Sequence, residues 1–299
     1  MKENNPATGH LAAFVTIFVW GTTFISTKIL LKTFTPVEIL FLRFMLGYLV
    51  LWLVKPHFLR PGQKGQEKYF IAAGLCGVTL YYLLENVALM YTQASNVGVV
   101  ISVAPFFTAI FSRLFLHGGR PSRRFYFGFV LAICGIFLIS FSSEQALQLN
   151  PLGDVLALLA AVVWAVYAVI TRKISEFGYH TVQTTRRTFF YGLIFMIPAV
   201  VLMDFRVTPD QLLDGSNLGN ILFLGLGASA VCFVTWNLAV RKLGSVRTSV
   251  YIYLVPVITT VTSVIVLHEK ITAAAAGGIG LTLAGLFLSE SGHRVKKQI

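Results

Sequence analysis

Long uninterrupted apolar runs constrain this chain more than any other feature. Ten such runs follow one another along the 299 residues. A helix of about 20 apolar residues crosses a hydrocarbon layer about 30 Å thick. The runs are continuous rather than alternating, which favours helices over the strands of a membrane barrel. We therefore predict an all-α integral membrane protein with ten transmembrane helices at 10–31, 36–54, 69–90, 94–116, 123–142, 152–172, 181–203, 218–240, 245–267 and 272–290.

The composition excludes a soluble protein. Hydrophobic residues make up 56% of the chain and charged residues only 12%, whereas a soluble domain carries about 25% charged residues. The net charge of +12 does not indicate a nucleic-acid partner, because the basic residues occur in short clusters between apolar runs. Cys76, Cys134 and Cys232 lie inside apolar runs without the spacing of metal ligands. We therefore expect no metal, no cofactor and no nucleic acid.

The basic clusters predict the orientation in the membrane. With a cytoplasmic N-terminus, clusters such as Arg120, Arg123 and Arg124 fall on the cytoplasmic side, and few basic residues such as Lys32 and Arg206 fall outside. Cytoplasmic loops carry an excess of lysine and arginine. We expect a multi-pass protein with both termini in the cytoplasm.

The two halves of the chain repeat one another. Gly9, Trp20, Lys28 and Arg43 match Gly153, Trp164, Arg172 and Arg187 at a constant offset of 144 residues, and Asn86, Ala88, Pro105 and His117 match Asn237, Ala239, Pro256 and His268 at an offset of 151. The repeats are expected at 1–147 and 148–299, with five spans each. Because five is odd, the second repeat enters the membrane from the opposite side, as in many secondary transporters.

Pro105 and Pro256 occupy matched places near the middle of two spans. Proline removes a helix hydrogen bond and clashes with the preceding turn. Interrupted helices at equivalent places in two halves are typical of transporter sites, so we interpret both prolines as hinges. The alternative is a kink that packing tolerates.

Several segments resemble a known family. FVWGTTF in the first span, ALMYTQASNVGVVISVAPFFTAI, and LHEKIT after the ninth span are similar to the EamA branch of the drug/metabolite transporter superfamily. The resemblance implies ten helices around a central cavity and export of small metabolites, such as amino acids, across a bacterial inner membrane. Members commonly carry a glutamate just after spans four and nine. Glu269 matches the second of these, whereas His117-Gly118-Gly119 stands at the first.

One carboxylate lies inside a predicted span. Glu85 follows Tyr81 and Tyr82 by one helical turn and precedes Asn86 in YYLLENVALMYT. A charge inside a membrane is costly, so Glu85 should face a partner or water. Arg43, about 10 Å below the outer face by helical rise, is the candidate partner. The pair is a static staple, a site for a substrate ammonium or a proton, or a gate.

Aromatic residues form the second part of the expected site. The predicted solute cavity is lined by aromatic rings, which suit amphipathic solutes and hold amines by cation–π contact. Ordinary helix packing is the alternative for each of them. The remaining candidate residues are Trp20, Thr23, Trp164, Tyr167, Asn237 and Tyr251.

Small residues three or four positions apart predict close helix packing. They are Gly128, Ala132 and Gly135 in the fifth span, and Ala276, Gly280 and Ala284 in the tenth. The two spans are expected to pack together within a monomer or to form the seam of a homodimer.

Other classes of function find little support. HEKIT lacks the second histidine of a zinc protease motif, no phosphate-binding glycine loop with lysine occurs, and no catalytic residues are expected. The sequence thus predicts a secondary transporter of small organic metabolites such as amino acids or amines, with proton coupling left open. A passive channel or facilitator for small polar solutes, and an intramembrane enzyme, are the alternatives.

Overall fold

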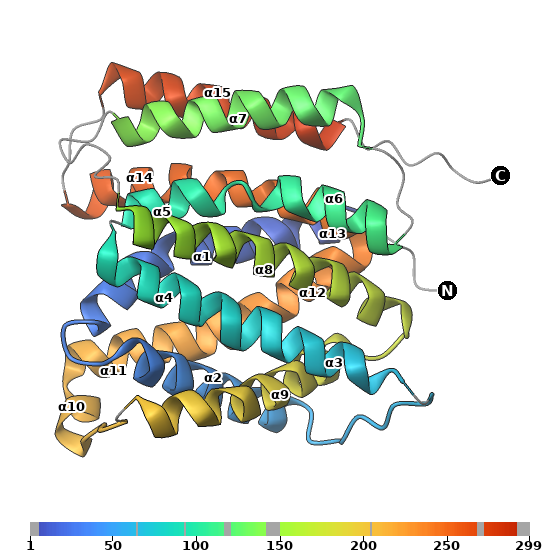
Figure 1. The fold of residues 1–299 in the computed structure, drawn as a ribbon, viewed down its shortest axis with the longest axis vertical. Coiled ribbons are helices and arrows are strands. Elements are labelled where there is room, and N and C mark those ends of the chain that lie inside the picture. Colours follow the sequence, from blue (N-terminus) through green and yellow to red (C-terminus); the bar gives the residue numbers. More distant parts are fainter. Residues whose placement is uncertain are drawn as a thin grey trace.

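The computed structural model describes residues 6–63, 65–92, 94–116, 121–141, 150–203, 205–267 and 272–291. Across these residues the secondary structure is helical, as the sequence predicts, and no strand occurs among them (Figure 1). The matched segments after spans four and nine, including Glu269, lie outside the described residues. In chain order the elements are α1 (Pro6–Leu30), α2 (Pro36–Val54), α3 (Glu67–Gly74), η1 (Leu75–Leu80), α4 (Tyr81–Tyr91), α5 (Ala94–Ile101), α6 (Ala104–Leu116), α7 (Arg123–Phe141), α8 (Pro151–Glu176), α9 (Thr181–Leu202), α10 (Pro209–Leu213), α11 (Gly215–Leu222), η2 (Phe223–Val231), α12 (Cys232–Leu243), α13 (Ser245–Ser249), η3 (Val250–Tyr253), α14 (Leu254–Leu267) and α15 (Ala273–Ser291).

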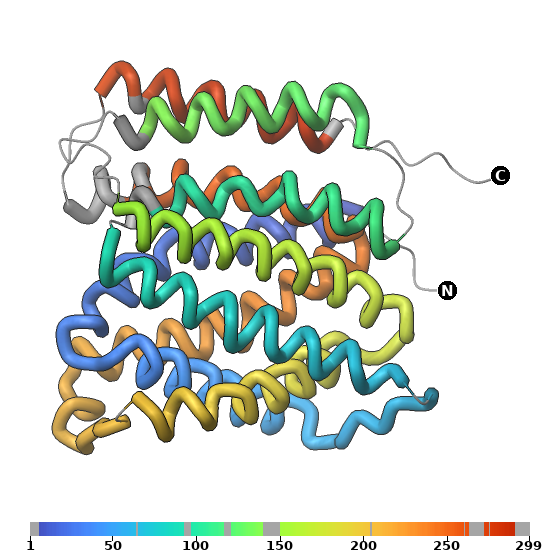
Figure 2. The backbone as a smooth tube through the Cα atoms, viewed as in Figure 1, coloured from blue at the N-terminus to red at the C-terminus, as the bar shows by residue number. Residues whose placement is uncertain are grey.

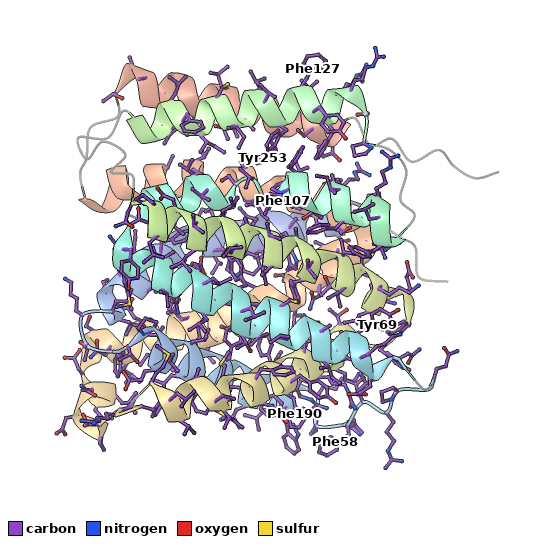
Figure 3. All side chains as sticks on the ribbon, viewed as in Figure 1. Phe58, Tyr69, Phe107, Phe127, Phe190 and Tyr253 are labelled. Carbon is purple, nitrogen blue, oxygen red and sulfur yellow. The ribbon has the colours of Figure 1, made fainter. Side chains whose placement is uncertain are left out.

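Seven helical segments of the described chain are long and apolar enough to cross a membrane. They correspond to the expected spans one to four and six to eight, and a shorter apolar helix covers Ala276–Glu290. Large apolar side chains lie on the outside, as a lipid environment requires. Phe127 of α7, which is 69% exposed, points away from the bundle, and so does Phe58, 73% exposed, in the loop after α2 (Figure 3). The structure therefore supports a multi-pass membrane protein, while the count of ten spans stays a prediction.

Polar caps fix where several helices begin. The Thr35 hydroxyl accepts from the Glu38 backbone N–H, and the Glu38 carboxylate accepts from the Thr35 N–H at 2.7 Å. Proline follows at the first position of α2, where its missing N–H costs no hydrogen bond. Asn150 caps α8 through the Gly153 N–H, again with a proline at the first position. These capping hydrogen bonds and prolines thus fix the residues at which α2 and α8 begin.

Helices α1 and α8, which begin the two halves, cross the bundle in opposite directions (Figure 2). Helices α7 and α15 lie side by side as an outer layer. The Tyr253 side chain lies between this layer and the rest of the bundle, with its ring 6.5 Å from that of Phe129 (Figure 3). The two halves are thus interleaved rather than separate bodies.

Small residues form the contact between α7 and α15. The predicted face is confirmed for α7 and is wrong for α15. Gly128 and Gly135 of α7 approach α15 so closely that a Cβ on either would overlap its backbone. On α15 the partners are Gly278, Thr282 and Gly285. The expected Ala276, Gly280 and Ala284 are exposed instead. The four-residue spacing exists on two faces of this glycine- and alanine-rich helix, and spacing alone does not choose between them.

Four expected spans contain a change of helix type. Residues of η1 and η2 form π-helix, and the two segments end at Leu80 and Val231, which match at the repeat offset of 151 residues. Near the matched prolines, α5 ends at Ile101 before α6 begins at Ala104, and η3 links α13 to α14. A π-helix adds a residue to the turn and is frequent at functional sites.

Candidate functional site

Three indole rings from both halves of the chain meet in the bundle. Trp20 of α1, Trp164 of α8 and Trp236 of α12 form this indole triad. Their ring centres lie 5.2 Å apart for Trp20–Trp164, 5.3 Å for Trp20–Trp236 and 5.4 Å for Trp164–Trp236. Phe233 contacts the triad from α12, 5.7 Å from Trp20. These tilted and edge-on arrangements are the favourable ones for aromatic rings.

More rings extend the triad toward α2 and α4. The Tyr81 ring lies 4.7 Å from Trp164 and 4.7 Å from Tyr82, and Phe44 lies 5.1 Å from Tyr82. Tyr167 lies 4.9 Å from Trp164 on α8. Together these side chains form the aromatic cluster, whose members are Trp20, Phe44, Tyr81, Tyr82, Trp164, Tyr167, Phe189, Phe233 and Trp236. Rings at such distances leave little space between them, so the cluster is closed in this conformation.

Arg43 lies buried at one side of the aromatic cluster, with 3% of its surface exposed. Its Nε donates a hydrogen bond to the Ser229 hydroxyl at 3.0 Å. Its guanidinium carbon lies 4.5 Å from the centre of the Tyr82 ring and 5.3 Å from that of Phe44. No carboxylate of the described chain forms an ion pair with it. Among the described residues, the contacts of this buried cation include two aromatic rings and the Ser229 hydroxyl, and the Glu85 carboxylate acts on it through space.

Glu85 is 7% exposed and accepts a hydrogen bond from the Tyr81 hydroxyl at 3.2 Å. It forms no ion pair with Arg43 in this conformation. Pairing in another conformation stays a prediction. Asn86, the next residue, donates to the Pro36 carbonyl at 3.3 Å and so ties α4 to the start of α2.

Two buried donors in the indole triad have no acceptor. The indole N–H groups of Trp164 and Trp236 find no hydrogen-bond partner within the described ranges. The N–H of Trp20, in contrast, donates to the Ala228 carbonyl at 2.9 Å. Buried donors normally have a partner, and each exception calls for an explanation.

The π-helical segments position this site across the two halves. Ser229 and Ala228, which bind Arg43 and Trp20, both belong to η2. In the first half, Gly77 of η1 packs directly on the Tyr167 ring, where any Cβ would overlap it. Thr79 of η1 donates to the Gly192 carbonyl of α9 at 2.9 Å. Each π-segment thus contacts the opposite half of the chain.

At the end of the bundle expected to face the cytoplasm, an ion-pair network joins the halves. Arg187 of α9 binds the Glu67 carboxylate of α3 through two nitrogens, at 2.8 and 2.7 Å, and donates to the Leu59 carbonyl. The Tyr191 hydroxyl donates to the same carboxylate. Arg186 donates to the backbone carbonyls of two residues of the 55–59 segment. We call the Arg187–Glu67–Tyr191 group the latch.

Asn237 lies near this end, between two partners. It accepts from the Tyr167 hydroxyl at 3.1 Å and donates to the Thr185 hydroxyl at 2.9 Å. A small polar recess of about 10 Å³ lies beside it, with Thr184, Thr188 and Arg241 in its wall. That volume holds about one water molecule.

Some sequence candidates lie away from the aromatic cluster, and some members of the cluster were not predicted. Tyr251 contacts His10, with 2.6 Å between its hydroxyl and Nδ1. The Thr23 hydroxyl donates to the Trp20 carbonyl of its own helix. Pro105 and Pro256 are buried beside the helix interruptions.

Sequence reasoning did not assign Phe44, Phe233 or Ser229 to the site. Ser229 is a polar residue inside an apolar run, and that was the one signal available for it.

Comparison with known proteins assigns the chain to a family. A profile described as the EamA-like transporter family matches residues 7–141 and again residues 151–290. The chain belongs to the EamA-like transporter family. This confirms the resemblance to the drug/metabolite transporter superfamily and makes the protein a membrane transporter.

Relatives of this EamA-like chain carry transporter names. An uncharacterized transporter of Archaeoglobus fulgidus is 29% identical over 94% of this chain and 96% of its own. A probable terminal-alkyne amino-acid exporter of Streptantibioticus cattleyicolor is 28% identical over 72% and 70% of the two chains. A probable amino-acid metabolite efflux pump of Escherichia coli is 24% identical over 96% of each. A solved crystal structure with 21% identity matches the fold with a TM-score of 0.73, over 95% of this chain and 96% of that one.

Proposed function

We propose that this EamA-like protein is a secondary transporter that exports small organic metabolites, such as amino acids or amines. In the proposal, two inverted five-helix repeats, 1–147 and 148–299, form ten membrane spans. The family profile matches twice, and α1 and α8 run in opposite directions. The names of the amino-acid exporters among its relatives support this class of solute. The family and those names indicate transport rather than catalysis.

The aromatic cluster is the observation that carries the proposal. It takes Trp20, Tyr81 and Tyr82 from the first repeat and Trp164 and Tyr167 from the second. A site made by both repeats changes shape when the repeats move against each other, as alternating access requires. Arg43, Glu85, Asn86 and Asn237 supply the polar groups, and Thr23 and Tyr251 line the approaches.

The latch provides one side of the alternating gate. In this conformation Arg187 and Glu67 hold the second repeat against the first at the expected cytoplasmic end. Opening toward the cytoplasm breaks this contact and parts the aromatic rings. The interruptions beside Pro105 and Pro256 let half-helices tilt while the outer halves stay packed, because a broken helix bends more easily than a continuous one.

The surroundings follow from the same proposal. The protein lies in a bacterial inner membrane with both termini in the cytoplasm, where most of its basic loops fall. Its partners are lipids and the solute. It works as a monomer or a homodimer, and protons are the candidate coupling ion at Glu85.

Counterflow in proteoliposomes tests the proposal. Vesicles containing the purified protein are loaded with an unlabelled amino acid or amine, and uptake of the labelled solute is followed from a dilute outside solution. A carrier shows transient accumulation and saturation, whereas a passive channel shows neither. Empty vesicles are the control. Saturable counterflow supports a carrier; non-saturable flux supports the channel, and chemical conversion of the solute supports an intramembrane enzyme.

A further inference from the structure

We propose that the aromatic cluster binds the carboxylate end of its solute, with Arg43 as the countercharge and the Trp164 and Trp236 N–H groups as donors. The substrate class is then an amphipathic carboxylate with an apolar or aromatic body, including α-amino acids, and a bare amine is disfavoured. This inference rests on the proposed transport function and deepens it.

The unpaired indole donors are the first reason. Trp164 is 2% exposed and Trp236 is fully buried, so water does not solvate their N–H groups. Their ring centres lie 5.4 Å apart, and in the proposal one solute that enters when the repeats part accepts from both N–H groups. A donor N–H requires an acceptor, which a carboxylate supplies and an ammonium does not.

The third indole of the triad, Trp20, provides a comparison with Trp164 and Trp236. Its N–H already donates to the Ala228 carbonyl of η2. Within the described residues, the indole of Trp20 therefore has a structural hydrogen bond, whereas the indoles of Trp164 and Trp236 have none. Ordinary packing accounts for Trp20, whereas the N–H groups of Trp164 and Trp236 have no acceptor among the residues that the structure describes.

The charge of Arg43 is the second reason. Among the described residues it forms no ion pair, and the Glu85 carboxylate acts on it only through space; a buried charge is stabilised when it is paired and hydrogen-bonded. Its guanidinium already covers the faces of Tyr82 and Phe44. The cation–π positions on those two rings are thus filled by the protein, and a second cation there would meet a like charge. A carboxylate meets the opposite charge.

Three solutes with the same body but different ends separate the alternatives. They are 3-phenylpropionate, phenylalanine and phenethylamine, tested together with straight-chain monocarboxylates and the corresponding amines of graded length. Thermal stabilisation of the purified protein and counterflow are measured for each, since a ligand of the folded state raises its stability. We expect the carboxylate members to stabilise the protein and exchange, and each amine to act at least about tenfold more weakly.

Conservative variants link this selectivity to the named atoms. W164F and W236F keep a ring and remove the N–H, and R43Q removes the charge. W164F and W236F are each expected to lower the ratio of carboxylate to amine transport by up to about tenfold. R43Q is expected to lower this ratio by more. W52F, at a half-exposed position in α2 near Phe58, is the control that keeps the preference. If one indole variant does not retain a cooperative melt, the other carries the comparison, and R43K, which keeps the charge but not the planar donors, replaces R43Q.

Two outcomes overturn the inference about the carboxylate but leave the proposed transport function standing. One is counterflow of amines without any response to the carboxylates, and the other is an unchanged preference in every folded variant. The absence of saturable exchange for all solutes of both series contradicts the proposed function itself.

Discussion

At the scale of single residues, the two matched arginines have different environments. Arg187 binds the Glu67 carboxylate with two nitrogens. Arg43 contacts rings and the Ser229 hydroxyl, and Glu85 accepts a hydrogen bond from the Tyr81 hydroxyl. A bidentate arginine–carboxylate pair is satisfied within the protein, so Arg187 fits a gate. Arg43 and Glu85 interact electrostatically without forming an ion pair, which fits a site that changes partners during transport.

We expect E85Q to slow counterflow by about tenfold or more and to remove its response to an imposed pH gradient. Glutamine keeps the shape of the side chain and its bond from Tyr81, but it cannot exchange a proton or balance a cation. Transport in vesicles at matched protein content measures the effect. E176Q, which removes only an exposed partner of Lys173, should transport normally. Normal rate and pH response in E85Q would take this residue out of the mechanism.

At the scale of elements, the π-segments decide how the halves meet. Both occur in glycine-containing runs, LCGVTL in η1 and FLGLGASAV in η2. The absence of a side chain on Gly77 lets η1 approach the Tyr167 ring, and η2 presents a carbonyl and a hydroxyl to Trp20 and Arg43. The extra residue in each turn also rotates the following helix, which brings Glu85 and Trp236 into the core.

Replacing Gly77 by alanine should destabilise the protein, because the new methyl group overlaps the Tyr167 ring. Overpacking of this kind costs about 1–3 kcal/mol. The matched control is G227A in η2, where a Cβ would lie 3.7 Å from the Phe223 ring, an ordinary contact distance. Thermal melting in detergent should show a lower midpoint for G77A and little change for G227A. Equal midpoints would show that η1 does not pack tightly on α8 in the membrane.

At the scale of the whole molecule, the proposed function requires two repeats inserted in opposite directions. The family profile matches each half separately, and α1 and α8 cross the bundle in opposite directions. Each half also supplies a π-segment that packs on the other. A pair of interlocked, oppositely directed units can expose the shared aromatic cluster to one side at a time.

Cysteine labelling tests the inverted arrangement directly. In a background with Cys76, Cys134 and Cys232 replaced by alanine, T8C and L152C place single thiols at exposed positions near the starts of α1 and α8. We expect a membrane-impermeant maleimide to label T8C only in inside-out vesicles and L152C only in intact cells. Labelling of both positions from the same face would rule out the inverted repeat and the transport cycle built on it.

The sequence by itself determined the class of the protein and the residues worth examining. Apolar runs, clustered basic residues and matched positions such as Trp20 and Trp164 are local properties, because burial in lipid depends on the composition of each segment. They indicated a helical membrane transporter, which the family match confirms. The constant offset also drew attention to Arg43 and Arg187 before any contact was known.

Only the tertiary structure decided which faces and partners these residues have. Helical spacing allowed two small-residue faces on α15, and packing against α7 selected Gly278 and Gly285. The π-turns shift the helical phase, so the ring contacts of Trp236 and Phe233 do not follow from counting residues. Arg187 pairs with Glu67, 120 residues away in the chain, whereas Arg43 forms no ion pair with a carboxylate of the described chain. Such pairings depend on how distant helices approach one another, and no local pattern encodes that distance.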